Sequence, residues 1–312
     1  MGRFRFQSDQ HSGSRPSRSG NRSRPLTRSA LGAAGLGVLL VGLTGCASAE
    51  EDKDAERRAF ALSGRTLTVD SDDSRLEIVA VEGAKEGEVR VTRWFDGSVV
   101  VGKDPKVSWE MQDGDRLVLR LHCSGFVADC EARHRIEVPR GVAVKVREGD
   151  GSVRASGFRE ALDIRTGDGS VRVEDVTGAV KVRTGDGSVR VGDVDGAVNV
   201  ETGDGSVRVQ GVSGALDVHT RDGSVRADVD SREVRTRTGD GSVDLQLGVI
   251  PDLVESRSGD GSVTISLPRA AYRVSTETGD GGVDVSVPRD ERSEHVVTAR
   301  TGDGKVTVRT AN

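Results

Sequence analysis

Aromatic residues are scarce in this chain of 312 residues, which has one tyrosine, two tryptophans and six phenylalanines. A core built from large rings is therefore excluded, and exposed rings that stack against sugars are not expected. Apolar runs are also short: the one at residues 30–42 falls well below the about 20 residues that a membrane-spanning helix needs. The second half of the chain lacks the i, i+3, i+4 apolar spacing of an amphipathic helix, so helices are not expected there.

Glycine and aspartate, by contrast, recur at a fixed interval. Gly-Asp-Gly occurs eight times, and Arg-Asp-Gly at 221–223 is a ninth, variant copy. A fixed period predicts stacked repeats, which carry rows of like side chains, whereas catalysis needs different groups that converge at one place. The first six central aspartates lie 18 residues apart and the later intervals are 20, 20 and 23 residues: Asp150, Asp168, Asp186, Asp204, Asp222, Asp240, Asp260, Asp280 and Asp303.

The repeat unit at 166–183 divides into two related halves, 169–173 and 178–182. In each half valines alternate with polar residues, so that Val171 and Val173 point inward while Arg172 points outward. The pattern predicts an all-β fold, a parallel β-solenoid built of about 18-residue, two-strand rungs over 147–312, with each valine above its equivalent. Antiparallel hairpins that close a sandwich or barrel are the alternative.

The longer intervals each contain a proline: Pro251, Pro268 and Pro288. Proline cannot donate to a strand ladder, so we expect these residues in loops or bulged corners. One outward column also changes character along the sequence, from basic to neutral or acidic. Its members are Arg154, Arg172, Arg190, Arg208 and Arg226, followed by Asp244, Thr264, Asp284 and Thr307.

The amino terminus has the pattern of an export signal. Seven arginines precede the apolar run at 30–42, and Leu43-Thr44-Gly45-Cys46 follows it directly. This tetrapeptide resembles a bacterial lipobox, in which the cysteine receives a diacylglycerol and becomes the first residue after cleavage. We expect a lipoprotein signal peptide at 1–45 and a lipid anchor on Cys46. An uncleaved signal anchor and an ordinary signal peptide with an incidental cysteine are the alternatives.

Cleavage before Cys46 would change the formal net charge from −5 to −11, because residues 1–45 hold seven arginines and one aspartate. An acidic surface does not suit nucleic acid, so no nucleic-acid partner is expected. Residues 46–59 are rich in acidic side chains and read as a flexible acidic tether. The predicted location is the outer, extracytoplasmic face of the cell membrane.

Between residues 60 and 146 the alternation of strands persists but the glycine period is lost. We interpret this segment as irregular N-terminal β rungs that form a cap, because stacked repeats need an atypical terminal unit. A separate small β domain is the alternative. Trp94, Phe95 and Trp109 would supply the bulky side chains that close the open end of a valine core.

Two cysteines remain beyond Cys46, namely Cys123 and Cys130. Outside the cytoplasm, a pair of this kind most simply forms a disulfide. Free thiols and metal binding with the nearby His122 and His134 are the alternatives, although paired ligand spacing is lacking.

The lipobox, the Cys…Cys segment that leads into Val-Pro-Arg-Gly at 138–141, and the Gly-[Ser/Ala]-Val-x-Val units together resemble a bacterial family named putative adhesins. The resemblance covers roughly residues 60–312. It implies an all-β solenoid at the cell envelope and implies no catalytic mechanism.

The aspartates of the repeat have two interpretations. Aspartate before glycine favours tight turns by bonding to its own backbone, which would make the row structural. Alternatively, stacked carboxylates form a calcium site, since oxygen ligands suit Ca²⁺. The candidate metal ligands are Asp150, Asp168, Asp186, Asp204, Asp222 and Asp240. No other cofactor is expected.

Catalytic groups are not recognisable. The histidines are scattered, His219 falls in an outward column, and the repeated serines lack the setting of a nucleophile. We therefore expect a non-catalytic, envelope-anchored lipoprotein that serves as an adhesin-like or scaffold surface for an unidentified protein or envelope polymer. The alternative is a calcium- or sugar-binding extracytoplasmic sensor module.

Overall fold

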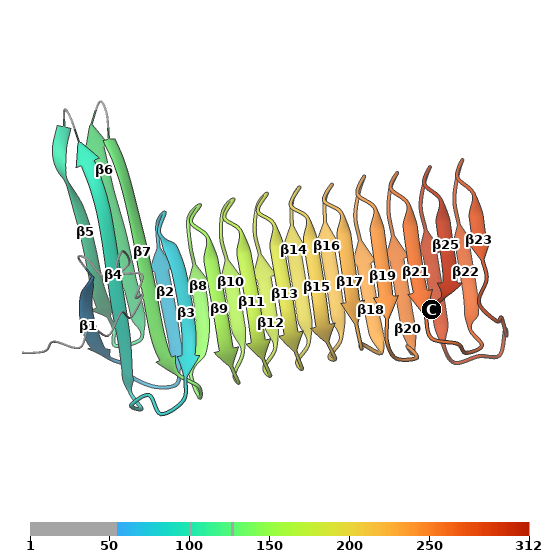
Figure 1. Cartoon of the computed structure of the whole chain (residues 1–312), viewed down its shortest axis with the longest axis horizontal. Coiled ribbons are helices and arrows are strands. Elements are labelled where there is room, and N and C mark those ends of the chain that lie inside the picture. The colour runs from blue at the N-terminus through green and yellow to red at the C-terminus, as the bar shows by residue number, and fades with distance from the viewer. Residues whose placement is uncertain (1–54, 100–101, 126–127, 312) are drawn as a thin grey trace, which may run out of the picture. The chain divides into compact units, whose positions relative to one another are not determined.

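The computed structural model describes residues 55–99, 102–125 and 128–311, and all regular structure in these ranges is β-strand (Figure 1). The described part of the chain offers no helix with the length and hydropathy needed to cross a bilayer. Its strands form two sheets that lie face to face. In spatial order, the first sheet contains β1 (Glu56–Ala61), β4 (Glu88–Val99), β7 (Ala128–Pro139), β3 (Arg75–Val81), β9 (Val153–Phe158), β11 (Val171–Val176), β13 (Val189–Val194), β15 (Val207–Val212), β17 (Val225–Val229), β19 (Val243–Leu247), β21 (Val263–Leu267), β25 (Val306–Thr310) and β23 (Val283–Val285).

The second sheet carries the other strand of each rung. In spatial order it contains β22 (Arg273–Glu277), β24 (Val296–Arg300), β20 (Leu253–Arg257), β18 (Glu233–Arg237), β16 (Leu216–Thr220), β14 (Val198–Thr202), β12 (Val180–Arg183), β10 (Leu162–Arg165), β8 (Ala143–Arg147), β2 (Thr66–Ser71), β6 (Arg116–Gly125) and β5 (Gly102–Gln112).

The repeat period sets the register of the central rungs. Val171 pairs with Val153 on one side and with Val189 on the other, in parallel strands. Val171 and Val189 are at most 1% exposed, whereas Arg172 between the inward valines faces solvent. β-Branched side chains suit this thin interior, because they pack well on a pleated, half-buried surface. The predicted parallel β-solenoid with two strands per rung is confirmed.

Glycine and threonine together make the tight corner of each rung. The Thr184 hydroxyl donates to the carbonyl oxygens of Gly167 and Gly169 in the preceding rung, at 3.0 and 3.2 Å. A Cβ atom built on Gly187 would lie 2.2 Å from the Gly169 oxygen, a distance that no real side chain tolerates. Rungs can therefore stack this closely at the corner only with glycine as the last residue of Gly-Asp-Gly.

The three prolines lie between strands, as predicted: Pro251 precedes β20, Pro268 follows β21, and Pro288 lies between β23 and β24. The rung order at this end differs from the sequence order. β24 and β25 insert between the rung β20–β21 and the rung β22–β23. The outward column therefore runs Arg226, Asp244, Thr264, Thr307 and Asp284, which corrects the order expected from the sequence.

The connection at 286–295 allows this insertion, because it is longer than the turns between the central strands. Tyr272 is fully buried beneath it and donates its hydroxyl to the carbonyl oxygen of Pro268 at 2.7 Å. Ser293 donates to the carbonyl oxygen of Ala271 at 2.8 Å. The connection is thus fixed to the outermost rung, β22–β23, before the chain continues into β24, which lies between that rung and β20–β21.

The same reordering occurs at the amino-terminal end. The rung β2–β3 lies between β6–β7 and β8–β9, with parallel pairing on both sides. Beyond it, β1 and β5 pair antiparallel with β4 and β6, and β4 pairs antiparallel with β7. Segment 60–146 therefore combines in-register rungs with antiparallel strands that cover the end of the stack.

Of the three aromatic side chains expected to close this end of the core, Trp109 is the one found packed against it among the described residues. Trp109 packs against the core and meets Phe60 edge to face, with ring centroids 6.1 Å apart. The Arg93 guanidinium carbon lies 4.4 Å from the centroid of the Trp109 ring. Trp94 points to the other face of β4, where the Arg133 guanidinium carbon lies 4.2 Å from its ring centroid.

Candidate binding surfaces

The six candidate aspartates all lie exposed at one corner of successive rungs, in the aspartate ladder Asp150, Asp168, Asp186, Asp204, Asp222 and Asp240. Within it, the backbone N–H of Asp168 donates to Oδ1 of Asp150 at 3.2 Å, and Asp186 donates to Asp168 in the same way at 3.2 Å. Asp204 continues this pattern onto Asp186 at 3.3 Å. One carboxylate oxygen of these residues therefore caps the next rung, a structural role that differs from the predicted bond to the residue's own backbone.

Within the described residues, no group of three or more His, Cys, Asp or Glu side chains is arranged to hold a metal ion. The structure thus brings the candidate ligands into one row but leaves them spread one rung apart. Calcium binding by the ladder remains a prediction.

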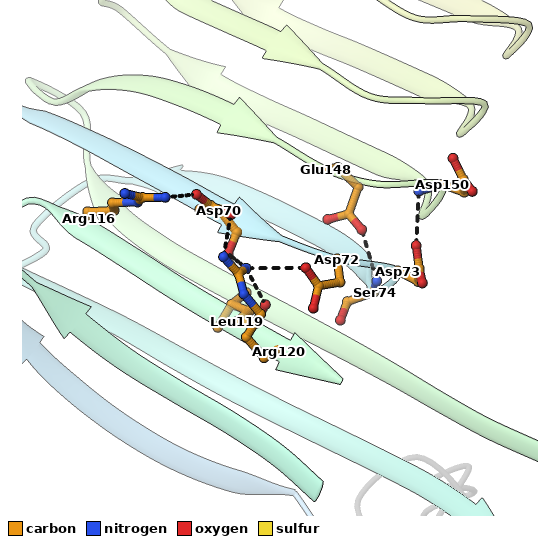
Figure 2. A network of polar contacts seen from close by, with 9 residues as sticks. All are labelled: Asp70, Asp72, Asp73, Ser74, Arg116, Leu119, Arg120, Glu148 and Asp150. Atoms are coloured by element: carbon orange, nitrogen blue, oxygen red, sulfur yellow. Dashed lines mark hydrogen bonds and ion pairs between the residues drawn. The ribbon is translucent and has the colours of Figure 1, made fainter. Parts of the chain in front are cut away.

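Glu148 marks an exception at the first regular corner (Figure 2). It lies 18 residues before Thr166, at the position that threonine occupies in later rungs. Its side chain is 7% exposed, and Oε1 accepts the backbone N–H of Ser74 at 2.9 Å. Among the described residues, Oε2 has no hydrogen-bond partner. A carboxyl group thus stands where a hydroxyl would otherwise donate to the preceding rung.

Burial raises the pKa of Glu148 to about 8, and the neighbouring carboxylates of Asp73 and Asp72 act in the same direction. The side chain of Ser71 and the backbone N–H of Ser74 oppose this shift only in part. Glu148 is therefore mainly protonated in the folded chain at neutral pH. Asp73 also receives the backbone N–H of Asp150 at 3.3 Å, which extends the corner pattern into the rung β2–β3.

Two arginines balance the acidic corner from β6. Arg120 lies 2.9 Å from Oδ1 of Asp70 and 3.5 Å from Oδ1 of Asp72, and Arg116 also pairs with Asp70 (Figure 2). Burial alone would raise the pKa of Asp70, but the hydrogen bonds from Arg116 and Arg120 hold it below its ordinary value. These ion pairs join β6 to β2 and to Asp72. Within the described residues, Glu148 itself forms no ion pair with an arginine or lysine.

Cys123 and Cys130 form a disulfide with their Cα atoms 6.2 Å apart, across the ends of β6 and β7. His134 lies on β7 and is 1% exposed, and neither of its ring nitrogens has a hydrogen-bond partner in the described part of the chain. Burial lowers its pKa to about 4, and the charge of Arg93 acts in the same direction. The candidate ligand His134 is thus enclosed as a neutral core residue, while His219 is exposed as predicted.

The outward face of the first sheet carries the arginine column, which comprises Arg154, Arg172, Arg190, Arg208 and Arg226. All five side chains are exposed. With rungs about 4.8 Å apart, adjacent unit charges in water repel by about 0.9 kcal/mol. The sequence revealed the column itself, but could not show which of its members find a carboxylate.

A serine column runs beside the arginines, formed by Ser170, Ser188, Ser206, Ser224 and Ser242. A hollow of about 340 Å³ lies between the two columns. A second hollow of about 570 Å³ follows the other sheet and includes the alanines Ala161, Ala179, Ala197 and Ala215. Neither hollow could be predicted from the sequence, since both depend on the conformations of exposed side chains.

These features define an all-β, two-sheet solenoid with long repeated surface columns. Residues 47–312 match the family model described as Toastrack DUF4097, and the chain belongs to this family. The match confirms the resemblance drawn from the sequence. No curated protein matches the chain.

Three solved structures share low identity with the chain. A putative adhesin from Parabacteroides merdae is 14% identical with a TM-score of 0.43, and covers 84% of this chain and 98% of its own. A putative adhesin from Bacteroides fragilis is 10% identical with a TM-score of 0.40, covering 83% and 98%. A putative cell adhesion protein from Clostridium sporogenes is 12% identical with a TM-score of 0.25, covering 83% and 100%.

Proposed function

We propose that the chain is a non-catalytic, adhesin-like protein of the cell envelope, held to the outer face of the membrane by a lipid on Cys46. The observation that carries this proposal is the surface of the stack, where one type of side chain recurs rung after rung. Such columns suit an extended partner, which gains the same contact many times, rather than a reaction at one point. Cys46 itself lies outside the described residues, so the anchor rests on the lipobox.

The anchor is tested by metabolic labelling with a fatty-acid analogue. Wild-type chain is expected to take up the label and to remain with the membrane fraction. Cys46→Ser is expected to lose both, because the thiol that accepts the lipid is gone, while Cys123→Ser is the matched control that retains them. Equal labelling of wild type and Cys46→Ser would contradict the lipid anchor.

Binding is tested separately, by mixing the purified full chain with isolated cell envelopes and measuring the bound fraction. We expect saturable binding that survives removal of the lipid. A bound fraction no higher than that of an unrelated acidic protein would contradict the adhesin-like role.

A second function, calcium sensing, is favoured by one observation: the exposed aspartate ladder uses one oxygen of each capping carboxylate within the chain. If the remaining oxygens bind Ca²⁺, millimolar calcium should raise the melting temperature of wild type. Replacing Asp168, Asp186 and Asp204 together by Asn should abolish that rise, since amide oxygens preserve the caps but carry no charge. An unchanged melting temperature of wild type with calcium would eliminate this function.

A further inference from the structure

The arginine column lies between two hollows on the first sheet. The hollow of about 340 Å³ on one side is lined by Ser188, Ser206, Arg190 and Arg208, among others. A hollow of about 200 Å³ on the other side is lined by Arg172, Arg190, Arg208 and Gln210, among others. The guanidinium groups thus stand along the middle of a track, with hydroxyl groups at one margin.

The charge of this track is incompletely matched within the chain. Arg172 pairs with Glu174, and Arg226 pairs with Asp244 at 3.0 Å. Arg154 lies near enough to Glu174 for its charge to help lower the pKa of that carboxyl. Among the described residues, Arg190 and Arg208 have no ion pair with a carboxylate within 4.0 Å. The middle of the track therefore presents cations that solvent or a ligand must neutralise.

The opposite sheet has two outward columns, and one of them also stacks arginines, such as Arg147, Arg165 and Arg183. Along the other outward column of that sheet, acidic, basic and amide side chains are interleaved: Lys145, Asp163, Lys181, Asn199, Asp217, Arg235 and Glu255. Interleaving relieves repulsion between stacked like charges. The arginine column of the first sheet lacks this pattern.

We propose that the arginine and serine columns bind a linear acidic polysaccharide with one carboxylate on each sugar. The guanidinium fork matches a carboxylate in geometry and charge, and serine hydroxyls can donate to or accept from sugar hydroxyls. Five arginines on adjacent rungs span roughly 19 Å, so a glycan lying along the stack meets several of them at once. The proposal rests on the proposed function, because a binding surface at the envelope brings the track to such polymers.

The track favours a glycan over single-stranded nucleic acid. Nucleic-acid channels combine positive charge with aromatic side chains on which bases stack. The residues that line the two hollows include no aromatic side chain, so base stacking is not available, and contact with a sugar chain would rest on charge and hydroxyl groups instead of ring stacking. Hydroxyl groups beside guanidinium groups instead match the alternation of hydroxyls and carboxylates on an acidic sugar chain.

The test uses fluorescein-labelled polygalacturonate and the full chain, with binding followed by fluorescence anisotropy at low salt. Arg190→Gln/Arg208→Gln is expected to weaken binding about tenfold, since each exposed charge contact contributes modestly. The control is Arg147→Gln/Arg237→Gln, which removes the same charge from exposed positions on the opposite sheet. It should bind within twofold of wild type, and thermal melts should show that both variants fold.

Three results would overturn the inference. These are absence of polygalacturonate binding by wild type, equal weakening in both double variants, and equally tight binding of polyphosphate, polyglutamate or single-stranded DNA. If wild type binds isolated envelopes but not polygalacturonate, this inference fails while the proposed function stands. If wild type binds neither, both fail.

Discussion

Val189→Asp is expected to lower the free energy of unfolding by about 3–5 kcal/mol, because it places an unpaired charge between two stacked rungs. Val189 is fully buried and lies in register between Val171 and Val207. No cation can reach the new carboxylate without opening one of the sheets. Urea unfolding followed by circular dichroism measures the loss.

The control for this substitution is the next residue of the same strand. Arg190→Asp introduces the same side chain on the outward face, where it meets solvent and two neighbouring arginines. Its effect should stay below about 1 kcal/mol. Similar losses at both positions would contradict the assignment of inward and outward columns.

Glu148→Gln is expected to remove much of the pH dependence of stability at neutral pH. The folded pKa of Glu148, about 8, lies above its value of 4.5 in an unfolded chain. Stability from this group is thus fully present below pH 4.5 and is lost as the pH rises through 8. The total loss is about 5 kcal/mol, at about 1.4 kcal/mol for each pH unit.

The contribution of His134 to stability changes with pH in the opposite direction. Its folded pKa, about 4, lies below its ordinary value of 6.5, so stability is lost as the pH falls from 6.5 towards 4. The two slopes oppose one another between about pH 4.5 and 6.5. The contribution of Glu148 is therefore best isolated between pH 6.5 and 8, where wild type should lose about 2 kcal/mol.

The measurement compares urea unfolding of wild type and Glu148→Gln at half-unit steps from pH 5 to pH 8.5. The difference in unfolding free energy should shift steadily in favour of the variant as the pH rises. Glu160→Gln, at an exposed position, should follow wild type throughout. A difference that does not change with pH would show that Glu148 is ionised in the folded chain.

Much of the fold could be predicted because the period itself encodes the register. A chain with Val171 and Val189 at equivalent positions needs only a parallel ladder to place one above the other. The order of rungs at each end could not be predicted in this way. The edge of every rung has the same alternation of inward and outward side chains. The local sequence therefore does not indicate that β21 pairs with β25 instead of with β23, the next strand of its sheet along the chain.

The surface was less accessible to sequence reasoning than the core. The arginine column followed from the period, but its unmatched members depend on side-chain conformations of neighbours such as Glu174 and Asp244. The sequence does mark Glu148, because this acidic residue occupies the repeat position that Thr166 and Thr184 hold in later rungs. Its burial depends on β2–β3 stacking against it, a pairing that crosses many residues of sequence.

The inserted final rung has a consequence for how the chain matures. A chain that emerges from its amino terminus onward can extend the stack by adding rungs to a growing end, as far as β21. The last two rungs cannot follow that course, since β24–β25 are made last yet lie between β20–β21 and β22–β23. The rung β22–β23 therefore cannot take its final place until β24 and β25 have been synthesised. Those two strands then pair with a rung on each side. Folding of this end is thereby completed only when β24 and β25 are available to fill the space between the two rungs.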